Sequence, residues 1–157
     1  MIVGFSLPIF ACYGGIVTAA VAFNVMGTGS GGGAGLTSVT SGSGPAVAVI
    51  RIEGAIVPGR GSPFDSSPIA ASGAIIPKIE KAKNDPDVKA IVLLVDSPGG
   101  GVVASDEIYH ALKNVDKPIV VSISDIGASG AYYISMASHW IVANPNSLVG
   151  SVGVISQ

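Results

Sequence analysis

The sequence predicts an α/β fold built on a largely parallel β-sheet. Three short apolar runs rich in β-branched residues, at 47–52, 88–95 and 118–124, are typical of strands. Two stretches with apolar residues at helical spacing, 72–84 and 102–114, separate these runs. Strands that alternate with helices are joined by right-handed crossovers, so neighbouring strands are expected to be parallel.

The first elements are a strand over 47–52, an irregular segment and a helix. Residues 53–71 are rich in Gly, Pro and Ser, and we interpret them as a hairpin or a long irregular loop. The hydroxyl of Ser72 is expected to cap the helix over 72–84. Pro77 lies close enough to the start of this helix to be tolerated there.

The remaining elements continue the alternation. Residues 88–95 are almost wholly apolar, which is the pattern of a strand buried on both faces. The helix over 102–114 carries apolar residues on one face, and 118–124 is a second buried strand. The predicted order ends with a short helix over 129–137 and strands over 139–143 and 149–155.

The N-terminal part of the chain differs sharply in composition, because its first 50 residues contain no Lys, Arg, Asp or Glu. Residues 2–26 are almost continuously apolar and, as a helix, could cross a hydrocarbon core of about 30 Å. We interpret residues 1–27 as a transmembrane anchor. A cleaved secretory signal with its cleavage site at 20–22 is the alternative. Residues 28–45 are rich in Gly and Ser and are predicted to be a flexible linker.

Composition excludes several functions. Charged residues make up 11% of the chain and the formal net charge is −2, so there is no basic excess to neutralise phosphates and nucleic-acid binding is disfavoured. Cys12 is the single cysteine, which excludes an internal disulfide and a cysteine-based zinc site. The sequence implies no metal and no other cofactor.

The first of two notable turns is Asp-Ser-Pro-Gly-Gly-Gly at 96–101. It follows a buried strand and precedes a helix, at the sheet edge where α/β proteins bind ligands. Its glycines allow a close backbone approach and could direct N–H groups at a developing oxyanion. Asp96 is expected to cap or brace this turn. An ordinary strand-to-helix connection is the alternative interpretation.

The second turn, at 125–131, carries Ser129 among small residues at the start of an apolar helix. Small neighbours leave the hydroxyl open to a substrate carbonyl, and the helix start supplies N–H groups beside it. A serine nucleophile needs both features, together with a base. The alternative is that the Ser129 hydroxyl caps the helix by bonding its first turn.

Together these motifs resemble the signal peptide peptidase A family. The resemblance rests on the turn at 96–101, on Gly-Ala-Ser-Gly-Ala-Tyr-Tyr-Ile at 127–134, and on Val-Gly-Ser-Val-Gly-Val-Ile at 149–155. It covers residues 47–157 in the right order and spacing. The family consists of membrane-anchored Ser-Lys serine proteases. Its Clp protease/crotonase-like fold has repeated β-β-α units with a largely parallel sheet.

The resemblance implies roles for individual residues. Ser129 matches the family's nucleophile, and the backbone N–H groups of Gly100 and Gly130 match the oxyanion hole. Ser151 matches a hydroxyl that orients the catalytic base. Val102 and Val103 are expected, by analogy, to line an apolar substrate pocket. Ala131 replaces a second glycine of the family motif.

The base in this family is a lysine, which the resemblance places downstream of Ser129. The last lysine here is Lys117, before Ser129. We therefore expect residues 46–157 to be a C-terminally incomplete protease domain of a longer protein, inactive alone, with its lysine beyond residue 157. His139 and His110 are expected to be ordinary packed or surface histidines rather than substitute bases.

The resulting hypothesis is a membrane-bound serine endopeptidase that degrades cleaved signal peptides or similar membrane-released peptides. The resemblance implies a homo-oligomer, anchored in the cell membrane by a single span, with the protease domain on the extracytoplasmic side. Two alternatives stay open. One is a catalytically inactive pseudoprotease that scaffolds a membrane complex, and the other is a crotonase-like acyl-CoA enzyme.

Overall fold

The computed structural model describes residues 44–61 and 67–153. The predicted transmembrane anchor at 1–27 lies outside these residues, as does nearly all of the predicted linker at 28–45. Within the described residues, none of the helices has both the length and the apolar character needed to span a bilayer.

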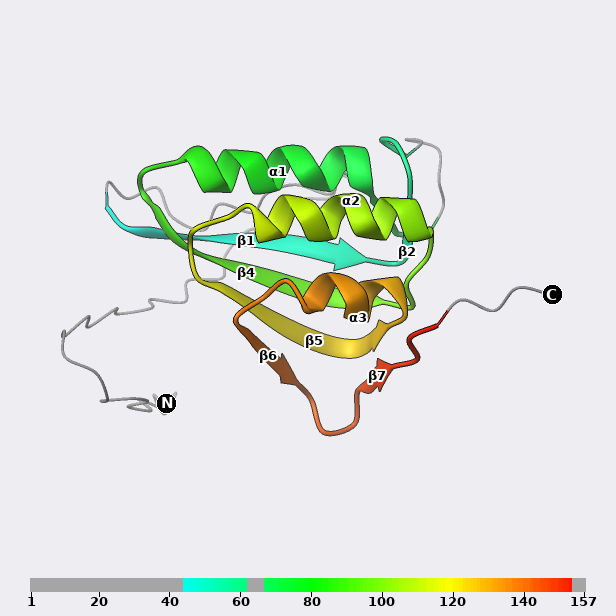
Figure 1. Cartoon of the computed structure of the whole chain (residues 1–157). Coiled ribbons are helices and arrows are strands. Elements are labelled where there is room, and N and C mark those ends of the chain that lie inside the picture. Colours follow the sequence, from blue (N-terminus) through cyan, green and yellow to red (C-terminus); the bar gives the residue numbers. More distant parts are fainter. Residues whose placement is uncertain (1–43, 62–66, 154–157) are drawn as a thin grey trace, which may run out of the picture.

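A parallel sheet of five strands forms the centre of the domain (Figure 1). The strands are β1 (Ala46–Glu53), β4 (Val88–Ser97), β5 (Ile119–Ala128), β6 (Trp140–Ala143) and β7 (Leu148–Gly150). The order is β1-β4-β5-β6, and β7 pairs with the later part of β5. Each of these pairings is parallel, which confirms the predicted sheet.

Two short strands, β2 (Ala55–Val57) and β3 (Ile69–Ala71), form a second sheet. They pair in parallel, so the hairpin interpretation of 53–71 is wrong. A hairpin requires antiparallel strands joined by a tight turn, whereas the long segment between β2 and β3 lets the chain return and run in the same direction. Ile56 of β2 also forms a bridge with Gly100, which ties this small sheet to the glycine turn.

Three helices cover one face of the central sheet (Figure 1). They are α1 (Ser72–Asn84), α2 (Val102–Lys113) and α3 (Gly130–Ser135). Their buried side chains, including Ile79, Ile108 and Ile134, form one core with the sheet side chains beneath them. Parallel strands need a layer of this kind to bury their apolar faces. The core residues of the sheet include Ile50, Ile52, Ile91, Leu93, Val95, Val121 and Ile123.

Helix α1 has the predicted bounds, but its N-terminal cap differs from the prediction. Ala71 occupies the N-cap position without a side-chain hydrogen bond, so the prediction that Ser72 caps the helix is wrong. Ser72 is instead the first helical residue and is buried, which places it in the packing rather than at the cap. At the other end, the Lys117 ammonium donates to the carbonyls of Ala82 (2.7 Å) and Asp85 (2.6 Å). Such bonds satisfy carbonyls that a helix end leaves without partners.

The strand count before each helix also departs from a simple repeat of two strands and a helix. Three strands, β1, β2 and β3, precede α1, but a single ten-residue strand precedes each of α2 and α3. The register between β4 and β5 shifts between Val95 and Ser97, which is the signature of a bulge. The first part of β5 pairs with β6 and its last residues pair with β7. The carboxyl ends of β4 and β5 therefore lie side by side where the two predicted turns begin.

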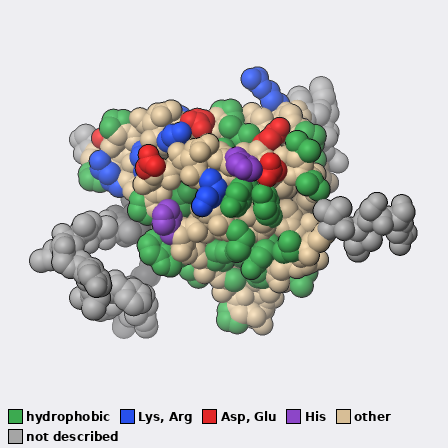
Figure 2. Space-filling view, viewed as in Figure 1, with side chains coloured by type: hydrophobic (Ala, Val, Ile, Leu, Met, Phe, Trp, Pro, Cys, Tyr) green, Lys and Arg blue, Asp and Glu red, His purple; other side chains and the backbone are tan. Residues whose placement is uncertain are grey.

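The outer edge of the sheet is apolar and exposed. Trp140 is 62% exposed in β6, and Leu148 is 64% exposed in β7. No Lys, Arg, Asp or Glu occurs after Asp125 in the sequence. Figure 2 shows the same asymmetry: charged side chains gather over α1 and α2, and the lower part of the molecule is hydrophobic or neutral.

Candidate active site

Ser129 lies between the last residue of β5 and the first residue of α3. Its backbone angles are φ 52° and ψ −122°, a conformation that a residue with a side chain rarely adopts. Such strain persists only when surrounding structure holds it, and it clusters at functional sites. The Ser129 side chain makes no capping hydrogen bond to α3. The N-cap interpretation of this hydroxyl is therefore wrong.

The glycine turn packs directly against Ser129. Gly99 is buried and has a φ of +93°. A Cβ atom added to Gly99 would lie 2.7 Å from the Ser129 Cβ and 2.7 Å from the Gly130 nitrogen. No side chain fits in that space, so only glycine allows the two turns to approach this closely. The two turns that the sequence singled out thus meet at one place.

Two of the three N–H groups in the glycine turn already have acceptors. The Gly99 N–H donates to Ser97 Oγ at 3.1 Å, and the Gly101 N–H donates to the Ile56 carbonyl at 2.8 Å. Among the described residues, the Gly100 N–H has no acceptor, and Gly100 is exposed. The turn therefore offers one N–H to a ligand.

The neighbouring bonds set the direction of that free N–H. The Gly99 carbonyl accepts the Ile56 N–H at 2.9 Å. A trans peptide directs its C=O and N–H to opposite sides, so the Gly100 N–H points away from Ile56. A Cβ atom on Gly130 would lie 3.5 Å from the Gly100 nitrogen, so this nitrogen lies beside Gly130. The Gly130 N–H, at the start of α3, also has no acceptor among the described residues.

Strand β7 brings Ser151 to the same region. The register pairs Ala128 with Gly150, and the Ser129 N–H donates to the Gly150 carbonyl at 2.8 Å. Ser151 follows immediately, has a φ of 53° and is exposed. The structure thus groups Ser129, Gly100, Gly130 and Ser151 at one end of the sheet.

Val102 and Val103 are the first two residues of α2 and directly follow the glycine turn. Their side chains are 64% and 69% exposed. They are accessible beside the grouped residues, on the surface of the domain.

Asp96 braces the junction between the two strands. Its Oδ1 accepts the Ile126 N–H at 3.2 Å, across the point where the β4–β5 register shifts. The sequence predicts that Asp96 braces the turn, but it does not identify the partner in β5.

Ser105 is a supporting residue that no sequence motif indicated. It is buried in α2, and its Oγ donates to the Gly101 carbonyl at 2.9 Å. A Cβ atom on Gly130 would lie 2.2 Å from this Oγ. Ser105 therefore holds the glycine turn and leaves room only for glycine at position 130. The four-residue spacing from Gly101 to Ser105 was the available signal, since one helical turn brings such residues together.

The histidines and Lys117 have partners elsewhere. His139 Nδ1 accepts the Ile119 N–H at 3.1 Å, and His110 Nδ1 lies 3.0 Å from the Asp106 carbonyl oxygen. Lys117 is engaged at the end of α1. That neither histidine acts as a substitute base stays a prediction.

A tyrosine pair joins α2 to α3 close to the site. Tyr109 and Tyr133 stack with their ring centroids 4.6 Å apart, and the Tyr133 hydroxyl donates to Asp106 Oδ1 at 2.8 Å. The hydrogen bond to this carboxylate, with a smaller contribution from burial, raises the pKa of Tyr133. This contact fixes α3, and therefore the residue before it, against α2.

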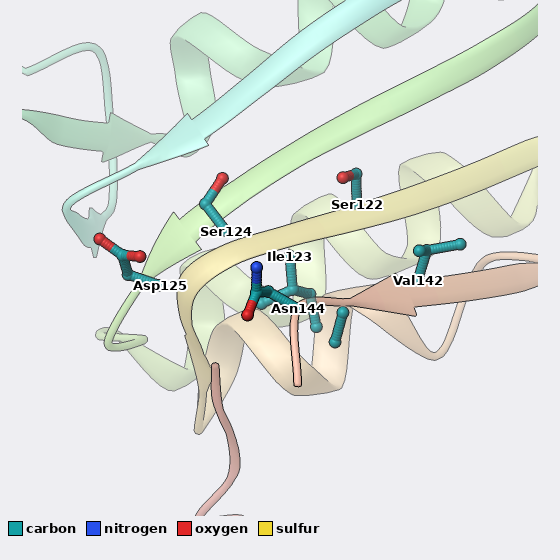
Figure 3. Close-up of a pocket in the computed structure, with 7 residues that line it drawn as sticks. Ser122, Ile123, Ser124, Asp125, Val142 and Asn144 are labelled. Carbon is teal, nitrogen blue, oxygen red and sulfur yellow. The ribbon is translucent and has the colours of Figure 1, made fainter. Parts of the chain in front are cut away.

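A polar pocket lies beside β5 and β6 but does not include the grouped residues (Figure 3). Figure 3 shows Ser122 and Ser124 on one side of β5 and Ile123 on the other. Within the described residues, no cluster of three or more His, Cys, Asp or Glu side chains could hold a metal ion. The pocket is lined by Ser122, Ile123, Ser124, Asp125, Val142, Ala143 and Asn144.

Solved structures of other proteins have the same fold as this domain. The membrane-bound stomatin-specific protease 1510-N superposes with a TM-score of 0.55 at 21% identity, over 73% of this chain and 53% of that chain. An enoyl-CoA hydratase from Mycobacterium avium subsp. paratuberculosis superposes with a TM-score of 0.53 at 20% identity, over 74% and 50%. These similarities concern the fold alone, and they confirm a crotonase-like α/β architecture.

Sequence comparison shows that the chain is similar to members of a peptidase family. Residues 111–157 match the model of Peptidase family S49. Protease 4 of Salmonella typhi is 42% identical over 115 residues, which is 71% of this chain and 18% of that protein. The chloroplastic serine protease SPPA of Arabidopsis thaliana is 36% identical over 112 residues, 70% of this chain and 16% of that protein. The chain thus spans less than a fifth of the length of these relatives, and it is a relative of the family S49 peptidases.

Proposed function

We propose that the protein is a serine endopeptidase in which Ser129 is the nucleophile. One observation carries the proposal: the glycine turn packs on Ser129 and leaves the Gly100 N–H beside Gly130 without an acceptor. A tetrahedral intermediate needs donors of this kind at the atom where negative charge develops. The strained backbone of Ser129 supports the same role, since such conformations cluster at functional sites and this residue belongs to neither the strand nor the helix.

In the proposed reaction, Ser129 Oγ forms a bond to the scissile carbonyl carbon while its proton passes to the base. The carbonyl oxygen becomes an oxyanion that the N–H groups of Gly100 and Gly130 stabilise. The C–N bond then breaks, and the base returns the proton to the departing amine. Water hydrolyses the remaining ester by the same route. Each oxyanion donor contributes about 10²–10³ in rate in comparable enzymes.

The proposed base is a lysine downstream of residue 157, held neutral so that it can accept the serine proton. Burial of an ammonium group lowers its pKa and favours that neutral form. We assign Ser151 to orient this lysine. Its position next to Gly150, whose carbonyl bonds the Ser129 N–H, supports the assignment.

The proposed substrates are cleaved signal peptides or similar peptides released from a membrane. Val102 and Val103 would contact apolar substrate side chains beside the oxyanion hole, which their exposure permits. We propose a homo-oligomer on the extracytoplasmic side of the cell membrane, anchored by residues 1–27. The apolar composition of that segment supports the anchor.

The fold shared with an enoyl-CoA hydratase keeps an acyl-CoA enzyme as the second candidate. Such an enzyme would use the same glycine turn but would not need a strained serine at position 129. A pseudoprotease scaffold would retain the fold and would not form a covalent bond through Ser129.

Labelling of the full-length protein with a fluorophosphonate tests the proposal. Wild-type protein is expected to be labelled and to cleave an apolar peptide, and Ser129→Ala is expected to do neither. Ser124→Ala is the matched control, because it removes another serine from the same strand region without touching the glycine turn. Equal labelling of wild type and Ser129→Ala would contradict the nucleophile assignment. Binding of acyl-CoA without peptide cleavage would favour the second candidate.

A further inference from the structure

We propose that Ser97 is a positioning residue for the oxyanion hole, acting through Gly99; the inference rests on the proposed function. Ser97 is the last residue of β4 and is fully buried. Its Oγ accepts the Gly99 N–H at 3.1 Å. No role was assigned to Ser97 by the sequence motifs, which pointed to the glycines alone.

The bond between Ser97 and Gly99 fixes one of the two peptide planes that flank Gly99. Because the acceptor lies two residues before the donor, the side chain closes a turn within the backbone. Pro98 stands between them and has no N–H of its own to offer. The bond therefore fixes the Pro98–Gly99 peptide, on the N-terminal side of the residue with a φ of +93°.

The second plane is fixed by Ile56, whose N–H donates to the Gly99 carbonyl at 2.9 Å. With both planes held, the conformation of Gly99 is determined and the Gly100 N–H has one direction, away from Ile56. Glycine has wide conformational freedom, so the direction depends on these two bonds rather than on the residue itself. The bond from Ile56 joins two backbone atoms. The bond to Ser97 depends on a side chain, so a substitution can remove it.

Removal of the Ser97 hydroxyl would leave the N–H of buried Gly99 without an acceptor. A buried N–H without a partner is unfavourable, and glycine can rotate to bring it toward water. Rotation would turn the Gly100 N–H away from the oxyanion. The transition state would lose stabilisation and substrate binding would not, because the oxyanion is absent from the bound substrate.

The experiment compares Ser97→Ala, Ser97→Thr and Ser135→Ala in the full-length protein with a peptide substrate. Ser135 is the matched control: it is also fully buried, and its hydroxyl donates to the Ala131 carbonyl at 2.7 Å, away from the glycine turn. We expect Ser97→Ala to lower kcat by about 10- to 100-fold, which is less than the roughly 10²–10³ of a lost oxyanion donor because the donor is misaligned and not removed, with KM changed by less than about twofold. Ser97→Thr keeps the acceptor and is expected to restore most of kcat.

A second readout separates positioning from general destabilisation. The affinity of a peptide boronate, which mimics the tetrahedral intermediate, should fall in Ser97→Ala by the same factor as kcat/KM. The affinity of a product peptide, measured in parallel, should not change. Should Ser97→Ala fail to fold, Ser97→Cys replaces it, because sulfur is a weaker acceptor and should also lower kcat.

The proposal is overturned if Ser97→Ala retains the kcat and boronate affinity of wild type, or if Ser135→Ala loses both to the same extent. It is also overturned if Ser97→Cys stands in and retains wild-type kcat. Failure of the proposed function looks different: the wild type would then not cleave the peptide, or Ser129→Ala would cleave it at the wild-type rate, whatever residue occupies position 97.

Discussion

The backbone N–H of Ser129 donates to the carbonyl of Gly150 at 2.8 Å. This bond continues the parallel pairing of β5 with β7 by one residue, into the strained turn that carries the serine hydroxyl. Because Ser129 has an unfavourable backbone conformation, its geometry depends on partners such as Gly150. The segment that provides this partner also carries Ser151.

Replacement of Ser151 by alanine is expected to lower kcat and to slow fluorophosphonate labelling in the full-length protein, because the base would lose a group that orients it. The pH profile of kcat/KM should also shift, since the proposed lysine would lose a hydrogen bond. Ser138→Ala, three residues after the end of α3, is the control and should leave the pH profile unchanged. An unchanged rate and profile in Ser151→Ala would contradict its assignment.

Replacement of Gly99 by alanine is expected to abolish labelling and to destabilise the domain. The new Cβ would lie 2.7 Å from the Ser129 Cβ, and the φ of +93° adds strain of about 1–3 kcal/mol. Gly59→Ala is the matched control: its φ is +76°, but nothing lies within 4 Å of the added Cβ. Thermal unfolding and labelling rates of the two variants separate backbone strain from the clash. Labelling of Gly99→Ala at the wild-type rate would show that the reactivity of Ser129 does not depend on its close contact with Gly99.

Replacement of Gly130 by alanine is expected to impair activity for a different reason. The added Cβ would lie 2.2 Å from Ser105 Oγ, and this contact would displace α2 or the start of α3. Ser105→Ala combined with Gly130→Ala removes that oxygen and should recover part of the stability and activity. Activities and unfolding temperatures of the two single variants and the double variant form a cycle. Strict additivity in that cycle would mean that Ser105 and Gly130 are not coupled.

Tyr133 is expected to titrate above the ordinary range of tyrosine, because the Asp106 carboxylate accepts its proton in a hydrogen bond and so raises its pKa. A raised pKa in the folded state means that neutral Tyr133 stabilises the domain below the pKa of the unfolded chain. This contribution is lost as the pH rises through the pKa of the folded state. Asp106→Asn should lower the pKa of Tyr133, measured by ultraviolet difference absorbance. Asp116→Asn is the control, and an equal effect of both variants would argue against the pairing.

Replacement of Lys117 by methionine is expected to destabilise the domain by about 1.5–3 kcal/mol, the range for hydrogen bonds to charged groups. Two carbonyls at the end of α1 would lose their donor. Lys113→Met removes an exposed lysine from the end of α2 and serves as the control. Urea unfolding measures both variants, and equal midpoints for wild type and Lys117→Met would show that the cap contributes nothing.

Local sequence patterns predicted the elements that alternate along the chain, because apolar periodicity reports which face of a strand or helix is buried. They failed for β2 and β3, which are three residues long and so too short to show a periodic pattern. Within the site, local patterns were limited in another way. Ser129 and Gly100 stood out as motif residues, but the partner of Asp96 lies in another strand. The direction of the Gly100 N–H likewise depends on Ile56, which no local pattern connects to the turn.

The uncharged outer edge formed by β6 and β7 has a practical consequence for anyone who purifies the described domain by itself. Unpaired strand edges that carry tryptophan, valine and leucine side chains on the surface tend to adhere to one another. A preparation limited to these residues should therefore precipitate or form polydisperse particles in light scattering. A lysine introduced at Val142 should disperse them without altering the helices.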